Sequence, residues 1–311
     1  MNQSLTHRVA FWRQCFIAFA TLALIGIVEV CCAQPWELWT INADGGGLQS
    51  FADSPGETFG SPDWSPDGKF VACDTWHFGQ PLTASQIAVM RADGSDRRLL
   101  GPGAMPSFSP DGTQIVCHTY DSPQTIVVMN ADGSGLETVI NHWGSPRWFP
   151  RGNRILSIDP GRDMLVLDLA TGTERRILPG NYTSQVGFGI ASDGRRICFG
   201  DIDDGLYLAT LDERTMKATV RSLVKGGIAR HCSWSPDDKR VVFGWKPNGQ
   251  ELEQIFVFDF DTNAATRLPG QDEKRNNACP DWSPDGKTIV FASQQPPLDG
   301  DKQRNSGGGV F

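Results

Sequence analysis

One short phrase recurs along this chain and constrains its fold more than any other feature. In its fullest form the phrase is an aromatic residue followed by Ser-Pro-Asp-Gly, and it marks the start of a repeat. Repeats of about 40 to 45 residues with short strand-like runs are the signature of a β-propeller that has one four-stranded blade per repeat. The six copies begin at Trp64, Phe108, Trp148, Ile190, Trp234 and Trp282.

Each full repeat carries two tight turns. In the first repeat these are residues 65–68, Ser-Pro-Asp-Gly, and residues 92–95, Ala-Asp-Gly-Ser. Proline and Asp-Gly supply the dihedral angles and the side-chain-to-backbone bonds of such turns, so each repeat reads as two hairpins with strands A to D. We therefore expect the aspartates of the first turn to shape the backbone and not to act as acids or bases. These aspartates are Asp67, Asp111, Asp193, Asp237 and Asp285.

The two ends of the repeat region are each incomplete. Residues 37–51 form a hairpin of the second kind without a first hairpin, and residues 278–293 form a first hairpin without a second. Strands from the two chain ends would complete one blade and remove the exposed sheet edges. The sequence thus predicts an all-β fold, a six-bladed β-propeller with four-stranded antiparallel blades. Its ring is closed by strands at about 37–51 joining strands at about 278–293.

The N-terminal residues have the composition of an export signal. Arg8 and Arg13 precede an apolar run from Cys15 to Val28, which suits a signal-peptide core better than a membrane-spanning helix. An uncleaved membrane anchor is the alternative. We expect residues 1–33 to be a signal peptide or membrane anchor, residues 34–293 the propeller, and residues 294–311 a flexible tail. The protein is then periplasmic or secreted, and only an uncleaved N-terminal segment would attach it to a membrane.

Charge and cysteine content exclude several classes of partner and site. The net charge of −8 argues against nucleic acid, which requires a basic surface. The five cysteines after residue 33 show neither the spacing of a zinc site nor that of a disulfide scaffold. The chain also lacks Gly-x-Ser-x-Gly, His-Glu-x-x-His and phosphate-loop motifs. We therefore assign no catalytic residues and no cofactor, and we expect a monomer.

Function is expected on one face of the propeller. Because blade strands alternate in direction, the A–B and C–D turns share one face, here called the turn face. The B–C loops and the links between blades share the other, here called the loop-rich face, and variable loops on a rigid scaffold commonly bind partners. The candidate binding residues of this face are Trp76, His77, His118, Tyr120, His142, Trp143, Arg162, Tyr182, Arg230, His231 and Trp245.

Two interpretations of these candidates remain open. All four histidines after residue 33 map to this face, and imidazole is a common metal ligand and general base. We expect no metal, but a divalent metal at His118, His142 and His231 is the alternative. The aromatic residues either pack within the loops or form a stacking platform for a sugar or a peptide.

The paired turns also carry a family resemblance. Six turns of the aromatic-Ser-Pro-Asp-Gly type, three of them complete, combined with hairpins such as Ala-Asp-Gly-Ser, resemble the WD-like propeller repeats of the TolB family across residues 37–293. The resemblance covers the propeller part only, without the α/β domain that precedes it in TolB. It implies a non-catalytic scaffold that binds a protein partner in the periplasm or cell envelope.

Certain pectin-fragment lyases are also similar. The segments 70–75 and 115–120 look like their strand B endings, and their metal is held by histidines. This resemblance implies an alternative function as a metal-dependent oligogalacturonate-type polysaccharide lyase, or as a sugar-binding propeller. His118, His142 and His231 would then be ligands or bases, and Arg162 or Arg230 would hold a substrate carboxylate.

Overall fold

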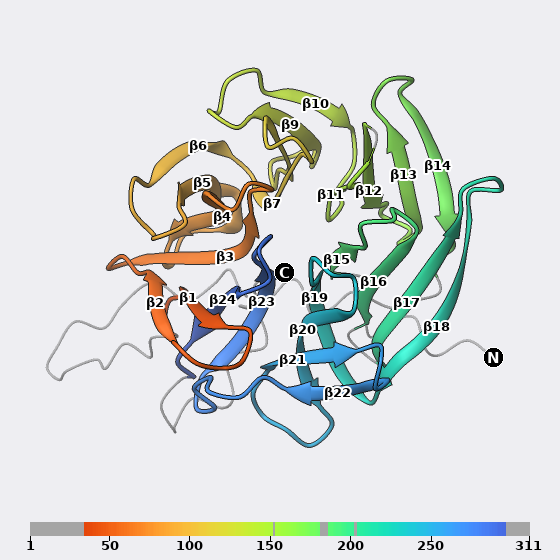
Figure 1. Cartoon of the computed structure of the whole chain (residues 1–311). Helices are drawn as coiled ribbons and strands as arrows, with labels where there is room; N and C mark the ends of the chain where they lie inside the picture. The colour runs from red at the N-terminus through yellow and green to blue at the C-terminus, as the bar shows by residue number, and fades with distance from the viewer. Residues whose placement is uncertain (1–33, 152, 181–185, 202–203, 297–311) are drawn as a thin grey trace, which may run out of the picture. The chain divides into compact units, whose positions relative to one another are not determined.

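The computed structural model describes residues 34–151, 153–180, 186–201 and 204–296 (Figure 1). The chain divides into Met1–Cys32 and Ala33–Phe311, and only the second unit is described here. The expected signal segment, residues 1–33, and residues 297–311 of the expected tail lie outside the described residues. Within the described part, no helix is long and apolar enough to cross a membrane.

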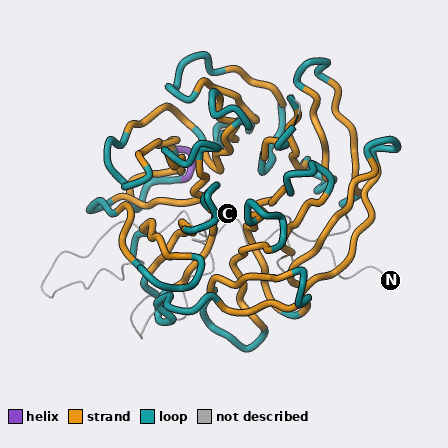
Figure 2. The backbone as a smooth tube through the Cα atoms, viewed as in Figure 1, coloured by secondary structure: helices purple, strands orange, loops and turns teal. Residues whose placement is uncertain are grey.

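The described chain forms six antiparallel sheets of four strands each, with one short 3₁₀ helix, η2 (Leu82–Ala84), shown in purple in Figure 2. Blade 1 contains β3–β6, blade 2 β7–β10, blade 3 β11–β14, blade 4 β15–β18 and blade 5 β19–β22, and blade 6 is ordered β2-β1-β24-β23. The strands are β1 (Glu37–Asn42), β2 (Gln49–Ala52), β3 (Glu57–Trp64), β4 (Phe70–His77), β5 (Gln86–Arg91), β6 (Arg98–Pro102), β7 (Ala104–Phe108), β8 (Gln114–His118), β9 (Ile126–Asn130), β10 (Glu137–Ile140), β11 (Arg147–Trp148), β12 (Arg154–Ile158), β13 (Met164–Asp168), β14 (Thr173–Leu178), β15 (Val186–Ile190), β16 (Arg196–Asp201), β17 (Gly205–Asp212), β18 (Lys217–Lys225), β19 (Gly227–Trp234), β20 (Arg240–Pro247), β21 (Gln254–Asp259), β22 (Ala264–Arg267), β23 (Asn276–Trp282) and β24 (Thr288–Gln294).

The blades close into a ring in the way the sequence predicts. The innermost strands β3, β7, β11, β15, β19 and β23 contact one another in this order, and β23 contacts β3. In blade 6, β1 from the N-terminal side pairs with β24 from the C-terminal side, with Leu38 opposite Ala292 and Ile41 opposite Ile289. The six-bladed fold and its two-plus-two closure are therefore confirmed (Figure 1).

The repeated Ser-Pro-Asp-Gly phrase forms the A–B turn through its own side chains. Ser65 Oγ donates to Asp67 Oδ1 at 2.7 Å, the Lys69 amide donates to the same oxygen at 3.1 Å, and the Phe70 amide donates to Ser65 Oγ at 2.9 Å. The Ser109, Ser235 and Ser283 turns repeat this arrangement. The hydrogen bond from Ser65 lowers the pKa of Asp67. The aspartates in these four turns are therefore turn formers, as expected.

The C–D turns dock each blade onto its neighbour. Gly94 has a φ of +82°, and a Cβ at this position would lie 2.3 Å from the Phe51 carbonyl oxygen on the outermost strand of the preceding blade. Gly133 meets the Leu100 carbonyl in the same way, at 2.8 Å. Glycine is thus required here by both its backbone conformation and the close approach.

The C–D turn of blade 4 lacks the sequence signal of the other blades. The outer strands of this blade, β17 and β18, form a long hairpin (Figure 1), although residues 212–216 contain no Asp-Gly signal. The turn is made by Asp212, whose Oδ1 accepts the Arg214 amide at 2.9 Å. A side chain that bonds its own backbone replaces glycine as the turn former.

Candidate functional site

Each blade places one residue, in or just before its innermost strand, against the central channel. This residue lies three positions before the lead residue of the repeat. In five blades the strand pairing is irregular here, and the residue has a positive φ between 38° and 69°, as expected of a β-bulge. We call the six equivalent residues the bulge ring: Ser61, Met105, Ser145, Gly187, His231 and Cys279.

Contacts link successive members of the bulge ring. Ser145 Oγ donates to Met105 Sδ at 3.3 Å, and the Gly187 amide lies 3.3 Å from the same hydroxyl. A Cβ on Gly187 would lie 2.4 Å from His231 Cδ2, and His231 Nδ1 is 3.2 Å from Cys279 Sγ. The hollow lined by the ring has a volume of about 30 Å³, which holds water-sized groups but not a sugar ring.

A second layer lies one residue before each lead position. Asp63 Oδ2 accepts the Phe108 amide at 2.7 Å, and Asp281 Oδ2 accepts the Trp64 amide at 2.8 Å. Each bond joins one blade to the lead residue of the next. Ser107 and Ser233 accept the Trp148 and Trp282 amides in the same way, at 3.3 and 3.2 Å.

In blade 3 the same layer carries an arginine, which joins three blades across the channel. Arg147 forms ion pairs with Asp63 of blade 1 and with Asp281 of blade 6, the latter at 3.2 Å. Burial raises the pKa of Asp63 to about 7, although the guanidinium acts in the opposite direction. Sequence reasoning did not single out these three residues. Their shared position directly before the lead residue is the signal that could have found them.

The structure brings three of the sequence-predicted candidates together between blades 2 and 3. The buried His118 ring lies 4.6 Å from the Tyr120 ring and 6.0 Å from the Trp143 ring. Burial lowers the pKa of His118 to about 4, so the imidazole is neutral near pH 7. His142 instead faces Glu174, with Nε2 at 3.3 Å from Oε1.

A second group lies between blades 5 and 6. Arg230 Nη1 is 3.9 Å from Glu253 Oε2, and burial raises the pKa of Glu253 to about 7. Burial is also the main reason that the pKa of His231 falls to about 3. Glu253 was not among the sequence-predicted residues because it carries no repeat signal.

The remaining candidates lie apart from these two groups. Trp76 and Trp245 are half-buried and pack against two different hydrophobic clusters, and Trp143 of the first group packs against a third. His77 is exposed at the end of β4, and Arg162 is exposed with a φ of 67°. Tyr182 lies outside the described residues. The three tryptophans thus lie at separate interfaces between blades.

No three histidine, cysteine or acidic side chains group closely enough to hold a metal ion anywhere in the described part of the chain. His118, His142 and His231 have three different surroundings: aromatic rings, Glu174 and Cys279. Metal chemistry at this face would therefore need other ligands, or fewer of them, than the three-histidine set.

Comparison with known proteins finds partial sequence relatives. No family model matches the chain. It is 29% identical over 139 residues to an uncharacterized protein, Atu1656, of Agrobacterium fabrum. The aligned region covers 39% of this chain and 46% of the relative. It is 32% identical over 120 residues to the Tol-Pal system protein TolB of Anaeromyxobacter dehalogenans. This aligned region covers 36% of this chain and 26% of the relative. The chain thus spans less than half the length of these curated relatives.

Solved structures show the fold more completely. A putative TolB from Agrobacterium tumefaciens matches 85% of this chain and 100% of its own, with a TM-score of 0.66 and 18% identity. TolB from Acinetobacter baumannii matches 80% of this chain and 66% of its own, with a TM-score of 0.65 and 18% identity. An oligogalacturonate lyase in complex with manganese matches 84% of this chain and 83% of its own, with a TM-score of 0.53 and 12% identity. The propeller of this chain is TolB-like.

Proposed function

We propose that the chain is an exported propeller that binds a protein partner in the cell envelope through its loop-rich face, without catalysis. A sequence relative is named as a TolB protein of the Tol-Pal system, and two structural neighbours are named as TolB or putative TolB. Export follows from the basic and apolar N-terminal segment, which has the pattern of a signal peptide.

An exposed aromatic side chain on the loop-rich face is the observation that carries this proposal. On the turn face, aspartates such as Asp67 and Asp285 are committed to bonds within their own turns. The loop-rich face carries Phe78, which follows β4 and leaves 42% of its surface exposed, beside the exposed His77. Exposed aromatic side chains on a rigid scaffold are common anchors of protein interfaces. Phe78 was not predicted from the sequence because nothing in its surroundings marks it.

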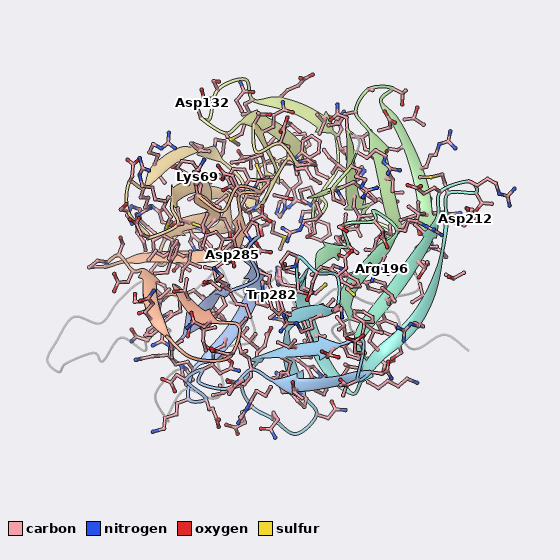
Figure 3. All side chains as sticks on the ribbon, viewed as in Figure 1. Lys69, Asp132, Arg196, Asp212, Trp282 and Asp285 are labelled. Atoms are coloured by element: carbon pink, nitrogen blue, oxygen red, sulfur yellow. The ribbon has the colours of Figure 1, made fainter. Side chains whose placement is uncertain are left out.

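Site-specific photocrosslinking tests the choice of face. A photoreactive amino acid at position 78 or 77 should give partner adducts in the native host. The matched controls are Lys69 and Asp132, two exposed residues of the turn face labelled in Figure 3, which should give none. Adducts from the turn face alone, or from neither face, contradict the proposal. Fractionation tests export separately: a full-length protein retained in the cytoplasm contradicts that part.

A further inference from the structure

The bulge ring gathers soft ligand atoms from three blades. Met105, His231 and Cys279 occupy equivalent positions in blades 2, 5 and 6, and all three line the same hollow. Thiolate and thioether sulfur are the ligands that Cu(I) prefers, and imidazole also suits copper. This ligand set differs from the three histidines considered above, since it shares only His231 with them.

The distance between two of these side chains is close to that of a chelating pair. Cys279 Sγ and His231 Nδ1 lie 3.2 Å apart. With metal–sulfur and metal–nitrogen bonds of about 2.3 and 2.0 Å, a tetrahedral or trigonal ion holds its sulfur and nitrogen ligands about 3.5–3.7 Å apart. The two atoms need to separate by only about 0.3–0.5 Å, a small side-chain rotation.

A second observation concerns the other nitrogen of His231. His231 is 8% exposed, and its Nε2 has no hydrogen-bond partner among the described residues. Because Nδ1 faces Cys279 Sγ, Nε2 can carry the ring proton while Nδ1 binds an ion. Met105 Sδ accepts the Ser145 hydroxyl and would turn from it to reach the ion. The hollow therefore offers a buried imidazole, a thiol and a thioether, which are suitable ligands for a soft ion.

The charge of the ligands favours a monovalent ion. The guanidinium groups of Arg230 and Arg147 lie within electrostatic reach of His231. Both are already paired with carboxylates, those of Glu253 and of Asp63 and Asp281, so the arginines do not decide the charge of the ion. One thiolate neutralises one monovalent ion, whereas a divalent ion with the same ligands keeps a net charge. An uncompensated charge is costly in a buried site.

We propose that Cys279 and His231, with Met105 as third ligand, bind one soft monovalent metal ion of the Cu(I) type in the bulge ring. The ion takes the place of the proton between sulfur and nitrogen. The Cys279 S–H bond breaks, an S–Cu bond forms, one proton leaves to solvent, and no oxidation state changes. His231 contributes a neutral imidazole and Met105 an uncharged thioether, so the loaded site is neutral.

Anaerobic titration with Cu(I) against a chromophoric competitor tests the site. The full chain is used with Cys15, Cys31 and Cys32 changed to serine, so that the N-terminal thiols do not compete. This parent protein should bind one Cu(I) per chain. Cys279→Ser should weaken binding about 100-fold or more, and His231→Gln at least about 10-fold, since even supporting residues of metal sites cost 10–100-fold.

The matched controls are Cys117→Ser, a buried thiol outside the hollow, and His142→Gln, which faces Glu174. Both should bind Cu(I) like the parent. X-ray absorption of the loaded parent should show sulfur and imidazole neighbours, a result that does not depend on any variant folding. A parent that binds less than one equivalent, a Cys279→Ser variant that binds as tightly, or a copper spectrum without sulfur overturns the proposal. None of these results depends on a partner protein.

Discussion

The arginine that crosses the channel offers the sharpest test of what holds the inner layer together. Arg147→Met removes the cation shared by Asp63 and Asp281, whose side chains are only 9% and 7% exposed. Removing one partner of a buried ion pair costs about 3–5 kcal/mol, because the remaining charge is left uncompensated. We expect the lower end, about 3 kcal/mol, since Arg147 itself is 21% exposed and each carboxylate keeps one backbone hydrogen bond.

Urea unfolding at pH 8 measures this loss. With a slope of about 3 kcal/mol/M, the Arg147→Met midpoint should fall by about 1 M. The triple variant Arg147→Met/Asp63→Asn/Asp281→Asn should recover to within about 1 kcal/mol of the wild type, because asparagine still accepts the backbone amides and no buried charge remains. The exposed pair Arg176–Asp163 is the control, and Arg176→Met should leave the midpoint unchanged. A triple variant as unstable as Arg147→Met alone refutes the charge argument.

Three further outcomes are expected. Gly94→Ala should destabilise the fold by about 2 kcal/mol or more, through a clash and a strained φ. Gly249→Ala, with a similar φ of +84° and nothing within 4 Å, should cost less, as urea midpoints will show. His118→Gln should reduce the acid sensitivity of stability between pH 6.5 and 4. In this window an unfolded histidine gains a proton that the folded one, with its pKa near 4, does not, so wild-type stability falls by up to about 3 kcal/mol as the pH drops. Ser109→Ala should raise the pKa of Asp111, which the Ser109 hydrogen bond holds at about 2, toward its ordinary value in an NMR titration.

The fold was predictable because its chemistry is local. Ser65, Asp67 and Gly68 make a turn with atoms no more than five residues apart. All the residues that form the turn are therefore visible in one short stretch of sequence. Closure of blade 6 was predictable from the two incomplete ends. The β17–β18 hairpin follows from the expected four strands per blade, but its turn carried no signal of its own because Asp212 forms it without a glycine.

The inner layers could not be predicted in the same way. Arg147 pairs with carboxylates 84 and 134 residues away, and no spacing along the chain predicts such a contact. His231 and Cys279 are 48 residues apart, and only an alignment of the repeats shows that they occupy equivalent positions. Several loop candidates, by contrast, lie at separate interfaces between blades, because a loop's position in sequence does not fix the direction of its side chain.

The position of a residue within the repeat indicates whether it serves the fold or can contribute to a site. Turn residues are similar in most blades because each blade needs the same kind of turn. The residues three positions before the lead vary among the blades, yet all six line the hollow at the axis where the blades meet. Copies of one repeat position can there combine different side chains into one site. The loop-rich face provides surface for a partner, whereas the channel can assemble chemistry. The Cys279–His231 pair and the Arg147 ion pairs are two results of that convergence.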